Sequence, residues 1–259
     1  MVRTRRGTWA ALLAVSITLA AKGQEVPDII DSRVPWSASS QLVVVTIPDW
    51  DSTRGEMRRF SRTGAGWEQV AGEVPVVIGR AGAAWGVGMH PMQPGPEKRE
   101  GDGRSPAGVF PLGIAFGYAE SADTGLPYVP MDASDWCIDV VDSPLYNQIV
   151  DARDVGADAV AGSTEPMRRD LHVDGDQRYK LGFVIQHNPA NEPDAGSCIF
   201  AHLWGAPDEP TAGCTAMAEP HMEETLAWLN LDANPVFVLL PQQEYEGLRG
   251  PWRLPNLSE

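Results

Sequence analysis

The sequence predicts a mostly β domain, arranged as a sandwich or as a curled sheet. Short runs of apolar and β-branched residues alternate with turns, and the 259 residues include 26 glycines and 22 prolines. Only one segment, over residues 220–229, carries apolar residues at helical spacing. Many short strands with glycine and proline turns are typical of all-β folds rather than of alternating α/β folds.

The first predicted strand covers residues 41–47, a β-branched run that Pro48 and Asp49 bring to an end. Residues 49–66 contain three glycines and are expected to form a hairpin region. Residues 66–70 follow as its return strand. The chain therefore begins its sheet with locally paired strands.

Residues 75–79 form the next predicted strand, and the glycine-rich stretch 79–90 follows it. This stretch is not a phosphate loop, because neither a Lys-Ser/Thr pair nor a helix signal comes after it. Residues 104–114 are expected to enter a strand from a turn. Residues 115–170 are acidic and irregular, apart from a short strand predicted over 136–141.

Two apolar strands of the C-terminal half carry a histidine at or near their ends. They cover residues 181–188, which include His187, and residues 198–202, which end at His202. A last apolar strand is predicted over residues 235–240.

One amphipathic helix is predicted between these strands. Pro220 is at a favourable first helical position, where a missing N–H costs nothing. Met222, Leu226 and Leu229 follow at spacings of four and three and are expected to face the core.

Residues 1–23 have the pattern of a secretory signal peptide. Three arginines lie among the first six residues, and the apolar run over 9–21 is too short to span a bilayer comfortably. Small residues precede Gln24, where the mature chain is expected to begin. We therefore expect export to the periplasm or cell envelope, without stable membrane insertion after cleavage. The alternative is an N-terminal membrane anchor.

The negative net charge of the chain limits the kinds of partner that it can bind. Of its 20 basic residues, four lie in residues 1–23, so the mature chain would keep 16 against 35 acidic residues, a net charge of −19. Such a chain is a poor binder of nucleic acid or anionic membranes. We expect an extension over 24–40, one domain over 41–242 and a tail over 243–259. The sequence does not indicate an oligomeric state.

The three cysteines are Cys137, Cys198 and Cys214. An exported chain usually pairs its cysteines, and an odd one is a candidate reactive thiol. A disulfide between Cys137 and Cys198 would leave Cys214 free. The alternative is three unpaired cysteines, two of them buried as small hydrophobic residues.

Cys214 and His202 are the residues with the strongest chemical pattern. His202 ends an apolar run, and Cys214 follows twelve residues later, directly behind Gly213. Thiol catalysis needs a thiolate, a base within hydrogen-bond reach and backbone N–H groups where negative charge develops. The sequence therefore predicts that Cys214 is a nucleophile and His202 its base.

Three motifs resemble those of the L,D-transpeptidase catalytic domain family, also called YkuD-like. Residues 101–112 (GDGRSPAGVFPL) resemble the family's "TP.G.F" strand entry, and residues 196–202 (GSCIFAH) its "G..IF.H" strand. Residues 211–214 (TAGC) resemble its "[ST].GC" nucleophile loop. The resemblance extends over roughly residues 40–242. It implies a β-sandwich or curled mixed sheet with one helix after the cysteine, and no cofactor or metal.

The resemblance also implies roles for particular residues. Cys214 would attack an amide carbonyl of a peptidoglycan stem peptide and form a thioester, and a second stem's amine would then take the acyl group. His202 would be the base, and the Leu203 carbonyl would orient its ring. The amides of Gly213 and Cys214 would form the oxyanion hole.

This chain departs from the common family pattern at two places. Ala212 replaces a histidine before Gly-Cys, and the arginine often found after the cysteine is absent. Arg80, in a glycine-rich stretch, is the first candidate to bind a substrate carboxylate instead. Further candidate substrate contacts are His187, Trp85 and Trp204.

Several alternatives to a transpeptidase are open. Water rather than an amine could resolve the thioester, which would make the protein a carboxypeptidase or amidase of the same fold. A catalytically silent peptidoglycan-binding module is a third reading. A zinc site built from His187, His202, Cys198 and Cys214 is disfavoured, because no CxxC, HxxxH or HExxH spacing occurs. A serine hydrolase is disfavoured by the absence of GxSxG.

Overall fold

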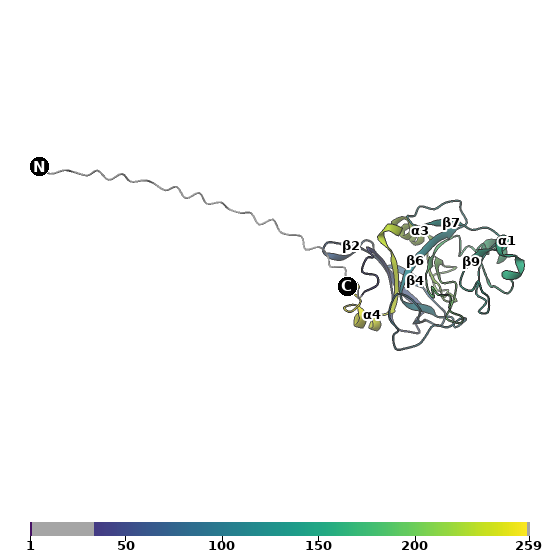
Figure 1. Cartoon of the computed structure of the whole chain (residues 1–259), viewed down its shortest axis with the longest axis horizontal. Helices are drawn as coiled ribbons and strands as arrows, with labels where there is room; N and C mark the ends of the chain where they lie inside the picture. The colour runs from purple at the N-terminus through teal and green to yellow at the C-terminus, as the bar shows by residue number, and fades with distance from the viewer. Residues whose placement is uncertain (2–33, 258–259) are drawn as a thin grey trace. The chain divides into compact units, whose positions relative to one another are not determined.

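The computed structural model describes residues 34–257 together with Met1 (Figure 1). The predicted signal peptide, from its second residue on, and residues 24–33 of the predicted extension lie outside the described residues. Among the helices of the described part, none has the length and apolar character needed to cross a bilayer.

Eleven strands join in one large mixed sheet. They are β1 (Gln41–Ile47), β2 (Arg54–Thr63), β3 (Gly66–Gln69), β4 (Val74–Val77), β5 (Ala83–Trp85), β6 (Ser105–Gly117), β7 (Tyr128–Pro130), β11 (Leu181–Ile185), β12 (Phe200–Leu203), β13 (Thr215–Met217) and β14 (Val236–Pro241).

The sheet curls until it closes on itself. Its strand order is β1-β14-β6-β11-β12-β13-β4-β2, and β2 pairs back with β1. The pairs β1–β14 and β12–β13 are parallel, whereas the other neighbours of the ring are antiparallel. The prediction of a mostly β fold is confirmed, and of the two arrangements left open the closed pairing selects the curled sheet.

The burial of β1 and β14, at the centre of the core, explains the sequence pattern of these two strands. All but one residue of β1 and every residue of β14 are buried. Because both faces of these strands are covered, they are continuous apolar runs rather than alternations of apolar and polar residues. The hairpin of β2 and β3 lies where the sequence predicted it.

Residues 131–180, between β7 and β11, form an insertion that the sequence predicted as largely irregular. The insertion contains a second, three-stranded sheet in the order β10-β8-β9. In Figure 1, its elements α1 and β9 lie at one side of the large sheet, and α4 lies at the other. Its elements are β8 (Asp135–Cys137), β9 (Ile149–Asp151), α1 (Ala152–Val155), η1 (Ala157–Ala159), β10 (Glu165–Pro166) and α2 (Arg169–His172).

The predicted amphipathic helix is α3 (Glu219–Trp228), and Met222, Leu226 and Leu229 are all buried as expected. Pro220 lies in its first turn, where its missing N–H has no helical partner to lose. Between Cys214 and this helix, β13 runs as a parallel partner of β12.

The C-terminal segment is part of the domain rather than a separate tail. After η2 (Leu231–Ala233) and β14, helix α4 (Gln242–Leu248) contacts β14 and β1. Trp252 is buried, and its carbonyl accepts a hydrogen bond from Trp36 Nε1 at 3.0 Å. Residues 34–40 and 242–254 therefore complete the same core, instead of only wrapping its surface.

Candidate active site

Cys214 lies at the entrance to β13, next to the strand that carries His202. In the parallel pair of β12 and β13, His202 is opposite Ala216. Side chains two residues apart on an extended chain point to the same face, so Cys214 lies on the side of the sheet to which His202 belongs. The amide of Phe200 donates a hydrogen bond to Cys214 Sγ at 3.3 Å. The parallel register thus places residues 202 and 214 on the same face of two neighbouring strands.

The loop that ends in Cys214 is held by two hydroxyl groups. Ser105 Oγ is 2.7 Å from the Gly213 carbonyl oxygen and 3.1 Å from that of Cys214. Thr211 Oγ1 also lies 2.6 Å from the Cys214 carbonyl. The Gly79 amide in turn donates to Ser105 Oγ at 2.9 Å. Because Ser105 is buried, these bonds connect the start of β6 rigidly to the cysteine loop.

Cys214 opens onto a polar cavity of about 240 Å³. The Cys214 residue as a whole is only 7 % exposed. Charged side chains from four separate segments of the chain face this space. The lining residues are Arg80, Lys98, Glu100, Gly101, Asp139, Thr164, Glu165, Ser197, Cys198, Ile199, Ala212, Gly213 and Cys214.

His202 is buried in the tautomer that a catalytic base requires. Its Nδ1 is 2.7 Å from the Leu203 carbonyl oxygen, which can only accept a hydrogen bond. Nδ1 therefore carries the proton, and Nε2 of the neutral ring keeps its lone pair. The ring also packs edge-on against Tyr179, with 5.1 Å between the ring centroids. The contact with Leu203 is the one expected from the sequence.

Burial dominates the electrostatics of both groups. It raises the pKa of the Cys214 thiol to about 12, and the negative charge of Glu165 acts in the same direction. Burial lowers the pKa of His202 to about 4, against the opposing effect of the Leu203 carbonyl. At neutral pH the site therefore holds a neutral thiol and a neutral imidazole, rather than a thiolate–imidazolium pair.

The amides of Gly213 and Cys214, which were expected to form an oxyanion hole, differ in the hydrogen bonds that they donate. The Gly213 amide already donates to Thr211 Oγ1 at 3.1 Å. The Cys214 amide donates no hydrogen bond to any of residues 34–257. Of the two N–H groups, only that of Cys214 is without a hydrogen-bond acceptor among the described residues.

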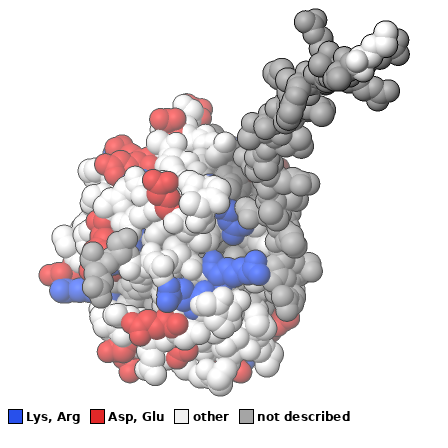
Figure 2. Space-filling model, turned by 90° about the vertical axis from the view of Figure 1, so that its left-hand side faces the viewer, with Lys and Arg blue, Asp and Glu red and all other residues white. Residues whose placement is uncertain are grey.

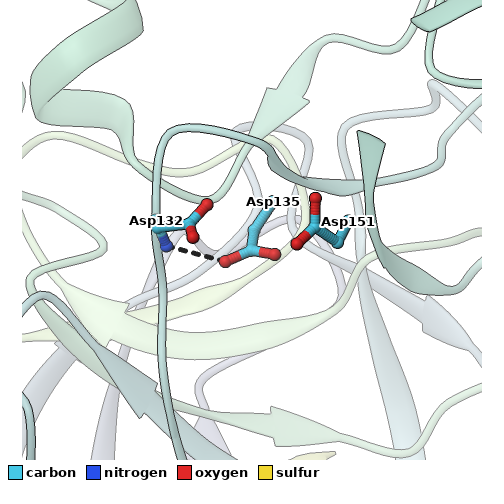
Figure 3. A group of neighbouring side chains, drawn as sticks. All are labelled: Asp132, Asp135 and Asp151. Carbon is cyan, nitrogen blue, oxygen red and sulfur yellow. Dashed lines mark hydrogen bonds between the residues drawn. The ribbon is translucent and has the colours of Figure 1, made fainter. Parts of the chain in front are cut away.

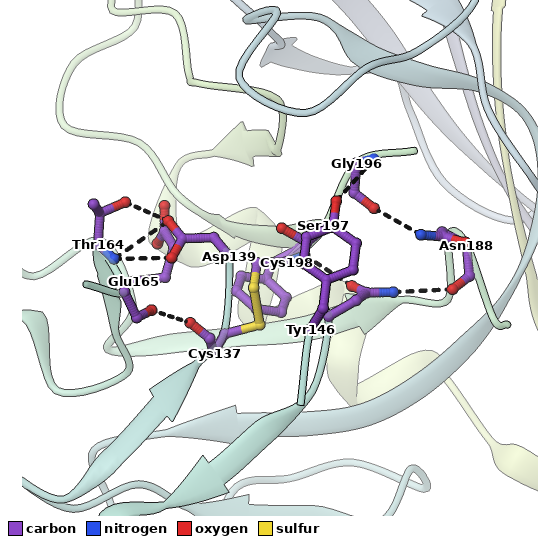
Figure 4. Close-up of a disulfide and its surroundings, with 12 residues drawn as sticks. Cys137, Asp139, Tyr146, Thr164, Glu165, Asn188, Gly196, Ser197 and Cys198 are labelled. Carbon is purple, nitrogen blue, oxygen red and sulfur yellow. Dashed lines mark hydrogen bonds between the residues drawn. A yellow bond between two sulfur atoms is a disulfide. The ribbon is translucent and has the colours of Figure 1, made fainter. Parts of the chain in front are cut away.

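Cys137 and Cys198 form a disulfide, and Cys214 is the free cysteine (Figure 4). The pairing agrees with the arrangement that the odd cysteine count favoured. The carbonyl of Cys198 lies 3.5 Å from Cys214 Sγ. The disulfide therefore ties the insertion to the strand entry that contacts the free thiol.

His187 has a structural role instead of the expected substrate contact. Its Nδ1 accepts a hydrogen bond from the Val87 amide at 3.2 Å, and its Nε2 lies 2.8 Å from the Ala195 carbonyl. Both ring nitrogens are thus already bound within the protein, and burial lowers the pKa of His187 to about 4.

The two tryptophans are also away from the thiol cavity. Trp85 is buried and donates from Nε1 to the Pro94 carbonyl at 3.0 Å, among the rings of Trp50 and Trp252. Trp204 lines a different hollow, beside Arg178. Neither residue lines the Cys214 cavity. Tryptophan supplies large apolar area to a core, and this is the role of Trp85 here.

Arg80 is the one expected substrate contact that lines the cavity. Its side chain passes so close to Gly103 that a Cβ there would come within 3.1 Å of it. Gly103 has a φ of +72°, a conformation that glycine adopts without strain. No ion pair joins Arg80 to an acidic residue in the part of the chain that the structure describes.

Sequence reasoning missed the acidic residues of the cavity. Asp139 and Glu165 belong to the insertion, whose strands are too short to show a period. Glu165 pairs with Cys137 across β10 and β8, so only the folded insertion places it beside the thiol. The role of Ser105 was within reach, because Ser105 lies in the motif of residues 101–112.

A separate group of carboxylates lies elsewhere in the insertion. Ligand oxygens of Asp132, Asp135 and Asp151 come within 4.8 Å of one another (Figure 3). Arg153 makes ion pairs of 2.5 Å with both Asp132 and Asp151. The guanidinium therefore already balances much of the charge of this group.

Acidic side chains are spread over the face drawn in Figure 2, with basic side chains among them. This surface agrees with the acidic composition of the chain.

Comparisons with protein-family models, with curated proteins and with solved structures each found no match. Any functional conclusion therefore depends on the residues of the site.

Proposed function

We propose that this protein is an exported cysteine acyltransferase of the L,D-transpeptidase type, which joins peptidoglycan stem peptides through a thioester on Cys214. One observation carries the proposal: a free thiol opens onto a charged cavity beside a strand that presents a histidine in the base tautomer. The resemblance of the three sequence motifs is the reason for proposing this family. Their residues converge here, since Ser105 of the first motif binds the loop of the third.

The proposed reaction begins with both groups neutral. Cys214 Sγ attacks the donor carbonyl while its proton passes to Nε2 of His202. The C–S bond forms, and the oxyanion accepts a hydrogen bond from the Cys214 amide. When the C–N bond breaks, the leaving amine takes the proton from His202, and the thioester remains.

Proton transfer in concert with attack suits the pKa values of this site. A preformed thiolate would be disfavoured by burial and by the nearby Glu165 charge. A neutral imidazole is the form that accepts a proton, and burial keeps His202 in that form. Arg80 is proposed to hold the carboxylate of the donor peptide, in place of the absent post-cysteine arginine.

Export is the remaining part of the proposal. It is supported by the signal-like pattern of residues 1–23 and by the Cys137–Cys198 disulfide, which persists in oxidising compartments.

Product analysis tests this function. Mature protein would be incubated with disaccharide stem-peptide substrates, and the products would be identified by mass spectrometry. We expect crosslinked dimers with the wild type and none with Cys214→Ala or His202→Asn at equal folded content. Shortened monomers without dimers would assign a carboxypeptidase or amidase instead. Turnover by Cys214→Ala would refute the thioester mechanism.

A further inference from the structure

Glu165 is a carboxylate in the thiol cavity that the mechanism above leaves without a role. It lines the cavity together with Cys214. Its Oε2 accepts a hydrogen bond from the Tyr179 hydroxyl at 2.6 Å. Its Oε1 makes no hydrogen bond or ion pair with any described residue. One oxygen thus fixes the carboxylate in place, and the other keeps its capacity to accept.

Two cations near Glu165, Arg169 and Lys98, are committed elsewhere, and Arg80, which lines the same cavity, makes no ion pair with Glu165. Arg169 is 3.8 Å from Glu165 Oε2, but it makes a shorter bond of 2.8 Å from Nε to Asp176. Lys98, which lines the same cavity, is paired with Asp102 at 2.6 Å. Glu165 is therefore a carboxylate with only a weak cationic partner. In a site of low dielectric, such a group attracts a positively charged ligand strongly.

The other carboxylates of the cavity differ from Glu165 in their hydrogen bonds. Glu100 Oε2 accepts from Tyr146 Oη at 2.5 Å and from Ser197 Oγ at 2.7 Å, and its Oε1 accepts from Gly101. Asp139 binds the amide and hydroxyl of Thr164. Figure 4 shows Asp139, Thr164 and Glu165 at one side of the disulfide, with Tyr146 and Ser197 toward the other.

Glu165 also acts on Cys214 through its charge and is connected to His202 through Tyr179. Its charge raises the pKa of Cys214 and of Tyr179. Tyr179 in turn packs against the His202 ring. The chain of contacts from Glu165 through Tyr179 to His202 therefore runs beside the thiol. Burial raises the pKa of Glu165 itself, as is useful for a group that exchanges a proton.

We propose that Glu165 binds the ammonium group of the acceptor and so directs the acyl group to an amine rather than to water. This inference rests on the proposed function, because it needs an acyl group on Cys214. The acceptor class it names is a primary ammonium, held by Glu165 Oε1 next to the thioester.

The proton balance of this second half-reaction is complete. The bound ammonium gives one proton to Glu165, and the amine attacks the thioester carbonyl. The new C–N bond forms, the nitrogen gives its second proton to His202 Nε2, and the C–S bond breaks. His202 returns that proton to the sulfur, and Glu165 releases its proton to solvent. An ammonium and a thioester thus become an amide, a thiol and one free proton.

The test separates this inference from the donor assignment. Because the buried thiol reacts slowly, Cys214 would be acetylated by long incubation with excess p-nitrophenyl acetate, which needs no stem peptide, and the acetyl enzyme would be confirmed by its intact mass before an acceptor is added. Cys214→Ala would correct for reaction at other groups. The acetyl enzyme would then be offered glycinamide, which is an ammonium ion at neutral pH, or hydroxylamine, which is largely uncharged there. Mass spectrometry would count acetylated glycinamide, acetohydroxamate and acetate.

We expect Glu165→Gln to lower the yield of acetylglycinamide about 10- to 100-fold and to leave the hydroxamate yield nearly unchanged, because removing a charged hydrogen-bond partner costs about 1.5–3 kcal/mol. Glu100→Gln is the matched control, since both of its oxygens are already bound, and it should keep the wild-type product ratio. Equal loss of both adducts, or an unchanged ratio, would overturn the proposal.

A second measurement uses only the wild type, so this test of the ammonium site does not depend on whether Glu165→Gln folds. Tetramethylammonium is a cation that cannot react, so it should suppress acetylglycinamide while sparing the hydroxamate. Equal effects on both products would contradict an ammonium site. A failure to crosslink stem peptides in the presence of this selectivity would refute the donor assignment alone.

Discussion

At the scale of single residues, the site is governed by burial. The Cys214 thiol and the His202 imidazole lie in the same low-dielectric region, and each is held in its neutral form. The charged forms are disfavoured because the protein offers few groups to replace their hydration. In the proposed reaction, a bound substrate must supply the groups that favour charge separation.

The thiol of the free enzyme should consequently be unreactive toward simple alkylating agents. At pH 7 a thiol with a pKa near 12 is ionised far less than a free thiol of pKa about 8.5. We expect iodoacetamide to modify Cys214 at least about 100-fold more slowly than it modifies glutathione. Timed labelling followed by peptide mass spectrometry measures this ratio. Labelling at the rate of glutathione would show an activated thiolate.

The two buried histidines predict a loss of stability in acid. Burial lowers the pKa of both His187 and His202 to about 4, from an ordinary value of 6.5. The unfolded chain therefore binds more protons between these values, so stability is complete above about pH 6.5 and falls as the pH drops toward 4. Each histidine contributes on the order of 3 kcal/mol over this window.

Urea unfolding at several pH values measures this effect. We expect the urea midpoint of the wild type to fall steadily between pH 6.5 and pH 4.5. The midpoint of His187→Gln, measured relative to its own value at pH 7.5, should fall less over the same range. A midpoint that is constant over this window would contradict neutral burial of the histidines.

At the scale of elements, the active site depends on connections between segments that are distant in sequence. The start of β6 holds the cysteine loop through Ser105, and the insertion reaches the same cavity through its disulfide to Cys198. Neither element contains Cys214. Each forms part of the wall of the cavity onto which the thiol opens.

Ser105→Ala should damage both the loop and the fold. It removes the hydroxyl bonded to two carbonyl oxygens and to the Gly79 amide, which leaves buried polar groups without partners. We expect the free energy of unfolding to fall by about 1–3 kcal/mol. The kcat of the proposed crosslinking reaction should also fall, while the number of free thiols per protein molecule stays nearly unchanged. Ser52→Ala, which removes a surface hydrogen bond, serves as the control. Equal effects of the two variants would contradict the anchoring role.

Reduction of the disulfide should release the insertion. Its two cysteines are 61 residues apart, for which loop-closure entropy gives roughly 4 kcal/mol of stabilisation. In a Cys214→Ala background, we expect Cys137→Ala/Cys198→Ala to unfold at lower urea concentration than the parent. Dithiothreitol should lower the parent's midpoint and leave the double variant unaffected. A dithiothreitol effect on the double variant would show another cause.

At the scale of the whole domain, both ends of the described chain belong to one core. Trp36 and Trp252 pack edge to face with 5.4 Å between their ring centroids, and Trp252 also contacts the ring of Trp85. The segment after β14 therefore stabilises the closed sheet from outside. It is not a dispensable tail.

Trp252→Ala should destabilise the domain by about 3–5 kcal/mol, as is usual for a buried tryptophan. Leu171→Ala is the control, because Leu171 is 57 % exposed and should change stability by less than about 0.5 kcal/mol. Thermal unfolding of both variants checks the difference. A Trp252 variant as stable as the control would show that the C-terminal segment is not part of the cooperative core.

The sequence by itself determined the parts of this protein that are local. Continuous apolar runs predicted β1 and β14, and the i, i+3, i+4 pattern predicted α3. The cysteine count pointed to one free thiol, and the motif that contains Cys214 pointed to the cysteine that opens onto the cavity. For the strands and the helix, the signal and the structure it predicts lie within a few residues of each other.

Only the tertiary structure decided the rest. Whether the sheet closed depended on the pairing of β2 with β1 and with β4, and the cavity depended on a disulfide across 61 residues. Glu165 reaches the thiol through that link, while His187, Trp85 and Trp204 are drawn into other contacts. Their residue types suit a substrate or a core equally well. The choice is made by neighbours far away in sequence, whose positions no local pattern encodes.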